Sequence, residues 1–158
     1  KGPPRTKIED QGNSYAFETK FKVPSNPAGN HYAYIGAKGD PWSVNYLLRV
    51  YHQSWGAEND VIDLFVSGSS QEEAVLDDFE FDKYYTLKVE VETTDNSDPA
   101  NDEINIKVYL DDGTGFTTNP LIDYTESKDS TNIVGIPVIG GKQTTVIYDY
   151  VRVNKLTN

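Results

Sequence analysis

The residues best suited to chemistry lie in one stretch, NYLLRVYHQSWG, at positions 45–56. Side chains alternate between the two faces of a strand, so one face would carry Val44, Tyr46, Leu48 and Val50. The other would carry Asn45, Arg49, Tyr51 and Gln53, with Leu47 as the exception, and Trp55 follows in the next turn. A cation, two amides and aromatic rings can stack on and hydrogen-bond to a polyhydroxylated ligand. Strand residues that face water are also polar by default, so a merely solvated face stays open as the alternative.

A second strand-like segment, residues 61–67, would add to the same polar face. Ile62, Leu64 and Val66 point one way by parity, whereas Asp63 and Phe65 point the other way. We therefore expect Asp63 and Phe65 to neighbour Arg49. The candidate ligand-binding residues are then Arg49, Tyr51, Gln53, Trp55, Asn45 and Asp63.

A carboxylate stands inside an apolar pattern near the end of the chain. In the segment 144–154, period-two counting puts Asp149 on one face with Ile147, Val151 and Val153. An ionised acid on a buried face is costly unless it is hydrogen-bonded, paired or bound to a metal. Two interpretations stay open: Asp149 is a ligand of a structural Ca²⁺ together with backbone carbonyl oxygens, or it accepts hydrogen bonds from backbone amides.

The elements that must position these residues are all strand-like. Alternating or apolar segments recur at 15–23, 31–38, 45–53, 61–67, 84–93, 104–110, 121–125, 132–139 and 144–154, separated by turn residues. The only helical signal is a capping-box spacing that allows one turn at 71–74. Segments 84–93 and 104–110 should form a long hairpin, and Gly140 and Gly141 should turn the chain. We expect an all-β antiparallel sandwich over residues 14–158, preceded by a linker or N-terminal strand at 1–13.

Bulk composition narrows the partners. The 158 residues suffice for one domain with a real core, and the absence of cysteine excludes disulfides and thiolate chemistry. The net charge of -11 argues against nucleic acid and anionic membrane surfaces as partners, and no apolar run is long enough to cross a bilayer. Residue 1 is lysine and methionine is absent, from which we expect a leader or neighbouring domain to have been removed.

Several short motifs, taken in order, carry a family resemblance. FETKFKV (17–23), YYTLKVEV (84–91), KVYLDDG (107–113), a glycine-led strand at Gly135 and the closing YDYVRV (148–153) are similar to pieces of the concanavalin A-like lectin and glucanase superfamily, as in laminarinase-type enzymes and laminin-G-like modules. The resemblance spans most of the chain from Tyr15 onward. It implies a jelly roll of two curved antiparallel sheets with glycans bound on the concave face or its rim. It also implies that Asp149 occupies the place of a structural Ca²⁺ ligand of the glucanase branch.

The chain departs from the family in its catalytic residues. Glucanases of this superfamily carry E-x-D-x-x-E or E-x-D-x-E on one strand, and neither motif occurs here. Glu90 and Glu92 share a strand face, but Lys88 beside them indicates a solvated surface rather than a catalytic pair. A lyase of jelly-roll fold could use Arg49, Tyr51 and Gln53, with His31 as a partner, although His52 falls on the opposite face from Arg49.

We therefore expect a non-catalytic, lectin-like carbohydrate-binding module that recognises a polysaccharide or oligosaccharide and is tethered within a larger secreted or cell-surface protein. The alternatives are a small polysaccharide lyase or glycoside hydrolase of jelly-roll fold, and a structural or adhesive sandwich with no sugar ligand.

Overall fold

A computed structural model describes residues 14–25, 31–39, 44–53, 59–94, 103–127, 138–141 and 145–156 of the chain. Every regular element in these ranges is a strand, and they contain no helix long and apolar enough to span a membrane. The strands are β1 (Tyr15–Lys22), β2 (His31–Gly39), β3 (Val44–Gln53), β4 (Asn59–Val66), β5 (Ser69–Val75), β6 (Tyr84–Thr94), β7 (Glu103–Asp111), β8 (Ile122–Ser127), β9 (Val138–Gly141) and β10 (Ile147–Lys155). The segment 1–13, expected to be a linker or strand, lies outside the described residues.

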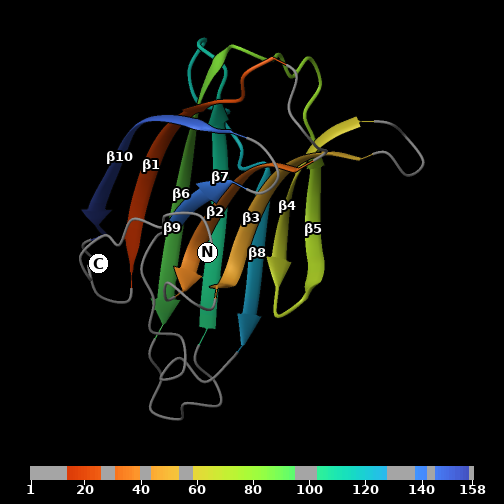
Figure 1. The fold of residues 1–158 in the computed structure, drawn as a ribbon. Coiled ribbons are helices and arrows are strands. Elements are labelled where there is room, and N and C mark those ends of the chain that lie inside the picture. The colour runs from red at the N-terminus through yellow and green to blue at the C-terminus, as the bar shows by residue number, and fades with distance from the viewer. Residues whose placement is uncertain are drawn as a thin grey trace.

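The strands form two antiparallel sheets of five strands each (Figure 1). Sheet A has the order β10-β1-β6-β7-β8, and sheet B has the order β5-β4-β3-β2-β9. The predicted long hairpin is present, because β6 pairs with β7 from Thr86 opposite Asp111 to Thr94 opposite Glu103. The prediction of an all-β antiparallel sandwich is confirmed.

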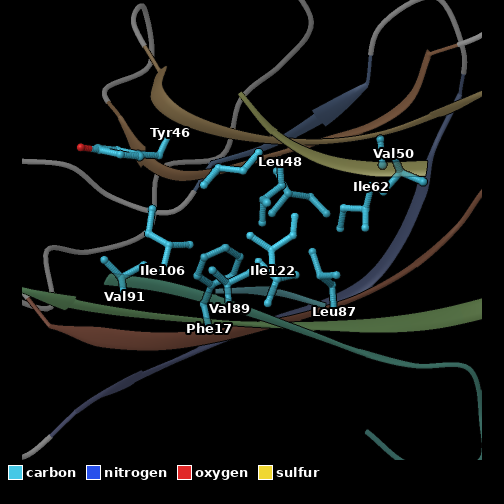
Figure 2. Close-up of a cluster of buried hydrophobic side chains, with 14 of the residues drawn as sticks. Phe17, Tyr46, Leu48, Val50, Ile62, Leu87, Val89, Val91, Ile106 and Ile122 are labelled. Atoms are coloured by element: carbon cyan, nitrogen blue, oxygen red, sulfur yellow. The ribbon is translucent and has the colours of Figure 1, made fainter. Parts of the chain in front are cut away.

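The core lies between the sheets and follows the period-two pattern of the sequence. Figure 2 shows Phe17 and Val89 of sheet A facing Leu48 and Ile62 of sheet B, and all four side chains are fully buried. Burial of one such side chain stabilises the fold by about 1.5–3 kcal/mol. The inward parity of β3 and β4 therefore fixes which of their residues must point away from the core.

Two tyrosine hydroxyls tie the sheets together. The buried Tyr46 of β3 donates a hydrogen bond to the carboxylate of Glu126 on β8. Tyr148 of β10 donates to the carbonyl oxygen of Gly140 on β9 over 2.6 Å. Burial raises the pKa of both hydroxyls, so each remains a donor at neutral pH.

Two local predictions are wrong. The segment 71–74 belongs to β5 rather than to a helical turn, because Ser67 and Gly68 form a tight turn that folds β5 back onto β4. Their φ values of 49° and 94° match the two positive φ angles of a type I′ hairpin turn. Gly140 and Gly141, expected in a turn, pair with β2 as part of β9.

Candidate functional site

The face of sheet B that points away from the core carries one polar residue on each of four adjacent strands. Tyr34 of β2 lies opposite Arg49 of β3, Arg49 lies opposite Asp63 of β4, and Asp63 lies opposite Glu73 of β5. We call this face the outer face of sheet B and these four residues the polar row. Each residue of the row points away from the core because its neighbour in the sequence points into it. These inward neighbours are Ala33, Leu48, Ile62 and Ala74.

Arg49 and Asp63 form a side-on ion pair at the centre of the row. Arg49 Nε donates to Asp63 Oδ1 over 2.9 Å, and Arg49 Nη2 donates to Asp63 Oδ2. The Asp63 side chain is fully buried, whereas 18% of the Arg49 side chain is exposed. The hydrogen bonds that Arg49 donates to Asp63 raise the pKa of Arg49, so the guanidinium is charged throughout the accessible pH range.

Of the five N–H donors of a guanidinium, two are taken by Asp63, so three remain. Within the described residues these three have no protein partner. They are available to a ligand that approaches the exposed edge of Arg49.

Aromatic rings flank the guanidinium. The Arg49 Cζ atom lies 4.0 Å from the ring centroid of Phe65 and 5.2 Å from that of Tyr51. Cation–π contacts of this kind hold the guanidinium plane in place. The Tyr51 hydroxyl donates to Glu73 Oε2 over 3.1 Å. Burial, together with the nearby carboxylates of Asp63 and Glu73, raises the pKa of Tyr51 to about 12.

The structure brings together three of the six predicted ligand-binding residues, namely Arg49, Tyr51 and Asp63. The expectation that Asp63 and Phe65 neighbour Arg49 is confirmed. Asn45 and Gln53 lie in β3 at the same parity as Arg49, and Trp55 lies outside the described residues.

Sequence reasoning missed Glu73, since it assigned that segment to a helical turn. The signal that could have found it is the Ser67-Gly68 pair, which makes a hairpin with β4 and so sets Glu73 opposite Asp63.

Asp149 does not lie on the buried face, and that prediction is wrong. Lys20 pairs with Tyr150 and Phe21 pairs with Tyr148, so Asp149 is the extra residue of a β-bulge and parity shifts by one there. Its side chain is 53% exposed, and Lys20 Nζ lies 3.6 Å from its Oδ2.

A Ca²⁺ ion at Asp149 would need five or more further oxygen ligands, and the N-terminal segment 1–13 that could supply backbone carbonyl oxygens lies outside the described residues. No group of three or more histidine or acidic residues among the described residues could hold a metal. The assignment of Asp149 as a calcium ligand therefore stays a prediction of the resemblance, without support from the geometry.

Glu90 lies on the other side of the sandwich from Arg49. It belongs to β6 of sheet A, where the Lys88 ammonium lies 3.1 Å from its Oε1. This ion pair agrees with the prediction that Lys88 lies beside Glu90 on the strand face away from the core.

Comparison with known proteins places the fold. No protein-family model matches the sequence, and no curated protein matches it either. Among solved structures, the carbohydrate-binding module CBM66 from Bacillus subtilis aligns with a TM-score of 0.59 and 19% identity over 90% of this chain and 75% of that one. Galectin-Ib of Xenopus laevis aligns with a TM-score of 0.56 and 10% identity over 97% and 100% of the two chains. Sheep galectin-11 aligns with a TM-score of 0.54 and 13% identity over 98% of each chain.

The chain has the concanavalin A-like jelly-roll fold. The resemblance drawn from the short motifs is thereby confirmed at the level of fold. At these identities the similarity concerns the fold alone, so any function has to be argued from the side chains of this jelly roll.

Proposed function

We propose that this chain is a non-catalytic carbohydrate-binding domain that binds a glycan on the outer face of sheet B, with Arg49 at the centre of the site. The observation that carries the proposal is the side-on pair with the buried Asp63. This pair orients the guanidinium beside two aromatic rings and leaves three N–H donors for sugar hydroxyls. Sugars suit such a face because their C–H surfaces stack on rings while their hydroxyls need donors and acceptors.

The charge of the polar row favours a neutral glycan. One guanidinium is set against two carboxylates, those of Asp63 and Glu73, and the whole chain carries a net charge of -11. A sulfated or uronate-rich polymer would bring further negative charge toward this surface. We propose that the natural ligand is a polysaccharide or oligosaccharide, and that the domain belongs to a larger secreted protein.

The names of structurally similar proteins support a sugar ligand. They include a carbohydrate-binding module, a homodimeric agglutinin from chicken liver, and congerin II with bound lactose. The sugar ligands belong to those proteins, and the polar row is the feature of this chain on which we base the same proposal for it.

The protonation state of Tyr51 favours binding over a lyase reaction. A tyrosine that removes a proton from a sugar ring should ionise near neutral pH. The pKa of Tyr51 is instead raised to about 12, by burial and by the carboxylates of Asp63 and Glu73. Tyr51 therefore acts as a ring and a hydrogen-bond donor rather than as a base.

The test is retention on a panel of neutral and acidic polysaccharides, combined with an assay for new reducing ends and unsaturated uronates. We expect the wild-type protein to bind a neutral polysaccharide without forming product. Loss of a hydrogen bond to a charged group costs about 1.5–3 kcal/mol, so Arg49→Ala should weaken binding by roughly tenfold or more. Arg49→Lys should weaken it as well, because lysine cannot reproduce the planar fork.

Two further variants separate binding from folding. In Arg49→Met combined with Asp63→Leu, no charge is left unpaired in the sheet, and this double variant should fold but lose the ligand. Arg152→Ala is the matched control, since Arg152 also stacks on an aromatic ring, Tyr150 at 4.4 Å, but lies on β10 of sheet A. Equal weakening by Arg152→Ala, unchanged binding by the double variant, or release of product would each overturn the proposal.

A further inference from the structure

A pocket of about 430 Å³ opens at one end of the sandwich, apart from the polar row. The connection between β5 and β6 forms one wall and the connection between β7 and β8 forms the other. Its floor is the end of the hydrophobic core, made by Leu76, Tyr85, Leu110 and Leu121. The volume lies in the range of small-molecule sites.

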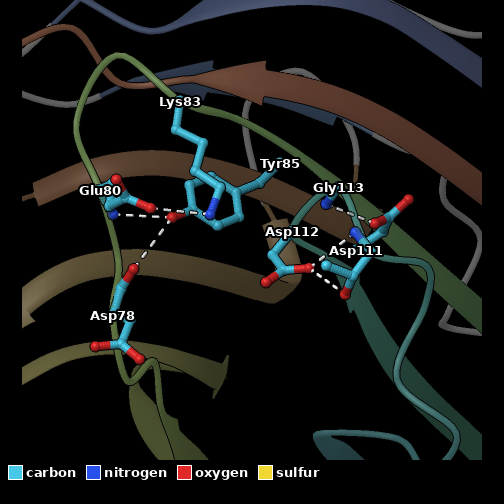
Figure 3. A network of polar contacts seen from close by, with 8 residues as sticks. Asp78, Glu80, Lys83, Tyr85, Asp111, Asp112 and Gly113 are labelled. Atoms are coloured by element: carbon cyan, nitrogen blue, oxygen red, sulfur yellow. Dashed lines mark hydrogen bonds and ion pairs between the residues drawn. The ribbon is translucent and has the colours of Figure 1, made fainter.

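The first wall is held by contacts to Tyr85. The ring of Phe79 stacks on that of Tyr85, with centroids 4.9 Å apart and an interplanar angle of 17°. The Tyr85 hydroxyl accepts a hydrogen bond from the Glu80 amide over 2.8 Å (Figure 3). At the far end of this connection, the Asp82 amide donates to the carbonyl oxygen of Val23 over 2.8 Å. The wall is therefore anchored both to β6 and to the end of β1.

The second wall is a turn in which the side chains of two aspartates accept hydrogen bonds from residues that follow them in the chain. Asp111 Oδ1 accepts hydrogen bonds from the amides of Gly113 and Gly115 over 2.7 and 2.9 Å. Asp112 Oδ1 accepts from both the amide and the hydroxyl of Thr114 over 3.1 and 2.7 Å. Figure 3 draws these contacts together with those of Glu80, Lys83 and Tyr85. These bonds fix Asp112 in the lining, and its pKa is lowered by them, so it is ionised at neutral pH.

The lining of the pocket combines apolar surface with negatively charged hydrogen-bond acceptors. Val75 and Phe116 expose 47% and 38% of their surface here, beside the stacked Phe79 and Tyr85. Three carboxylates, from Asp77, Asp78 and Asp112, stand against the one ammonium of Lys83. The Lys83 ammonium lies 2.9 Å from Glu80 Oε1, so its charge is already compensated.

We propose that this pocket binds a single neutral sugar residue and is a second carbohydrate site of the chain. The C–H face of a sugar packs against the rings and aliphatic groups of the floor, and the carboxylates accept hydrogen bonds from the sugar hydroxyls. The excess of carboxylates excludes uronates, sulfated sugars and phosphates. The two sites share no residue, so the pocket binds its sugar even if the polar row binds none.

The experiment is a titration of the ¹⁵N-labelled full chain, with backbone amides assigned, against the methyl glycosides of glucose, galactose, mannose and N-acetylglucosamine, and against methyl glucuronide. At least one neutral glycoside should shift the amides of residues 76–83 and 112–118, and methyl glucuronide should not. Oligosaccharides of the best sugar, run in parallel, show whether the pocket takes a free sugar or the end of a chain.

Three variants locate the site. Thr118→Trp places a large ring at the exposed rim of the pocket and should weaken these shifts at least tenfold. Asp77→Asn should weaken them severalfold, because an acceptor loses its charge without loss of a protein partner. Ser127→Trp, at the other end of β8, is the control and should leave them unchanged.

Three results would overturn the proposal. They are no shift in these two segments with any neutral glycoside, equal shifts with methyl glucuronide, and shifts that survive Thr118→Trp. Loss of the shifts in the folded double variant Arg49→Met with Asp63→Leu would also overturn it, since the pocket would then only report binding elsewhere. If instead this double variant loses polysaccharide retention while the shifts persist, the two sites are shown to be independent.

Discussion

Stability alone does not account for the ion pair of Arg49 and Asp63. Removing a carboxylate from water costs several kcal/mol, and a well-packed apolar pair often serves stability equally well. The pair does give the guanidinium one orientation, because Asp63 fixes two donors and Phe65 lies 4.0 Å from the Arg49 Cζ atom. A fixed guanidinium loses less conformational entropy when it binds a ligand, which is the reason to place an oriented cation on a binding face.

The two residues should differ in what their loss does to folding. Arg49→Ala leaves a fully buried anion and should lower the free energy of unfolding by about 3–5 kcal/mol. Asp63→Ala should cost less, because 18% of the Arg49 side chain is exposed and its charge can reach water. Urea denaturation of both single variants and of Arg49→Met combined with Asp63→Leu measures this. A larger loss in Asp63→Ala than in Arg49→Ala would contradict the assignment of Asp63 as the desolvated partner.

Tyr51 offers a ring and a hydroxyl whose contributions can be separated. Its hydroxyl bonds to the exposed Glu73, so Tyr51→Phe should change the free energy of unfolding by about 1 kcal/mol or less. Glycan affinity should fall only severalfold in Tyr51→Phe but at least tenfold in Tyr51→Ala, because only the second removes the stacking surface. Titration calorimetry with the retained polysaccharide measures both. Equal losses in the two variants would mean that the hydroxyl, and not the ring, contacts the ligand.

At the scale of elements, alternation along single strands predicts which face is buried, and pairing between strands decides the rest. The pattern of Tyr85, Leu87, Val89 and Val91 in β6 is regular enough to give both the strand and its buried face, and all four side chains are buried. Arg49, Tyr51 and Asp63 could be found because they are polar residues out of phase with a core.

Glu73 and Asp149 could not be placed by parity. The position of Glu73 depends on the turn at Ser67 and Gly68, and that of Asp149 depends on a bulge in the pairing of β1 with β10. Both features arise from the register between two strands, which alternation within one strand does not encode.

The bulge at Asp149 leads to a prediction about metal dependence. An exposed ion pair contributes about 0–1 kcal/mol, so Asp149→Ala should change the free energy of unfolding by no more than that. Thr19→Val is the comparison, since the fully buried Thr19 hydroxyl donates to the Tyr150 carbonyl oxygen over 3.2 Å at the same bulge. It should cost more than Asp149→Ala. A chelator should leave Tm unchanged, and a fall in Tm that Ca²⁺ reverses only when Asp149 is present would restore it as a calcium ligand.

At the scale of the whole molecule, tyrosine hydroxyls join the two sheets at opposite edges. Tyr46 donates from β3 to Glu126 of β8, and Tyr148 donates from β10 to Gly140 of β9. Within β8, Tyr124 donates to the same Glu126 carboxylate and so supports the first of these contacts. Each hydroxyl acts as a donor, so each contact needs the protonated form. The sandwich thus depends on groups that remain protonated in the fold at a pH where tyrosines of the unfolded chain have ionised.

This dependence predicts loss of stability in alkali. Burial and hydrogen bonding raise the pKa of Tyr124 to about 12 from an ordinary value of 10.0, and burial raises those of Tyr46 and Tyr148 further. Below pH 10 both states are protonated and the stabilisation is complete. Between pH 10 and 12 the unfolded chain binds fewer protons than the folded one, so stability falls by about 1.4 kcal/mol per pH unit for each of the buried Tyr46 and Tyr148 hydroxyls. The contribution of Tyr124 is smaller, because solvent screens its more exposed hydroxyl. Urea denaturation at pH 8, 10 and 11 measures how steeply the free energy of unfolding falls with pH. In Tyr148→Phe this slope should be smaller by the contribution of one hydroxyl. A slope unchanged by Tyr148→Phe would contradict the part assigned to Tyr148 in joining the sheets.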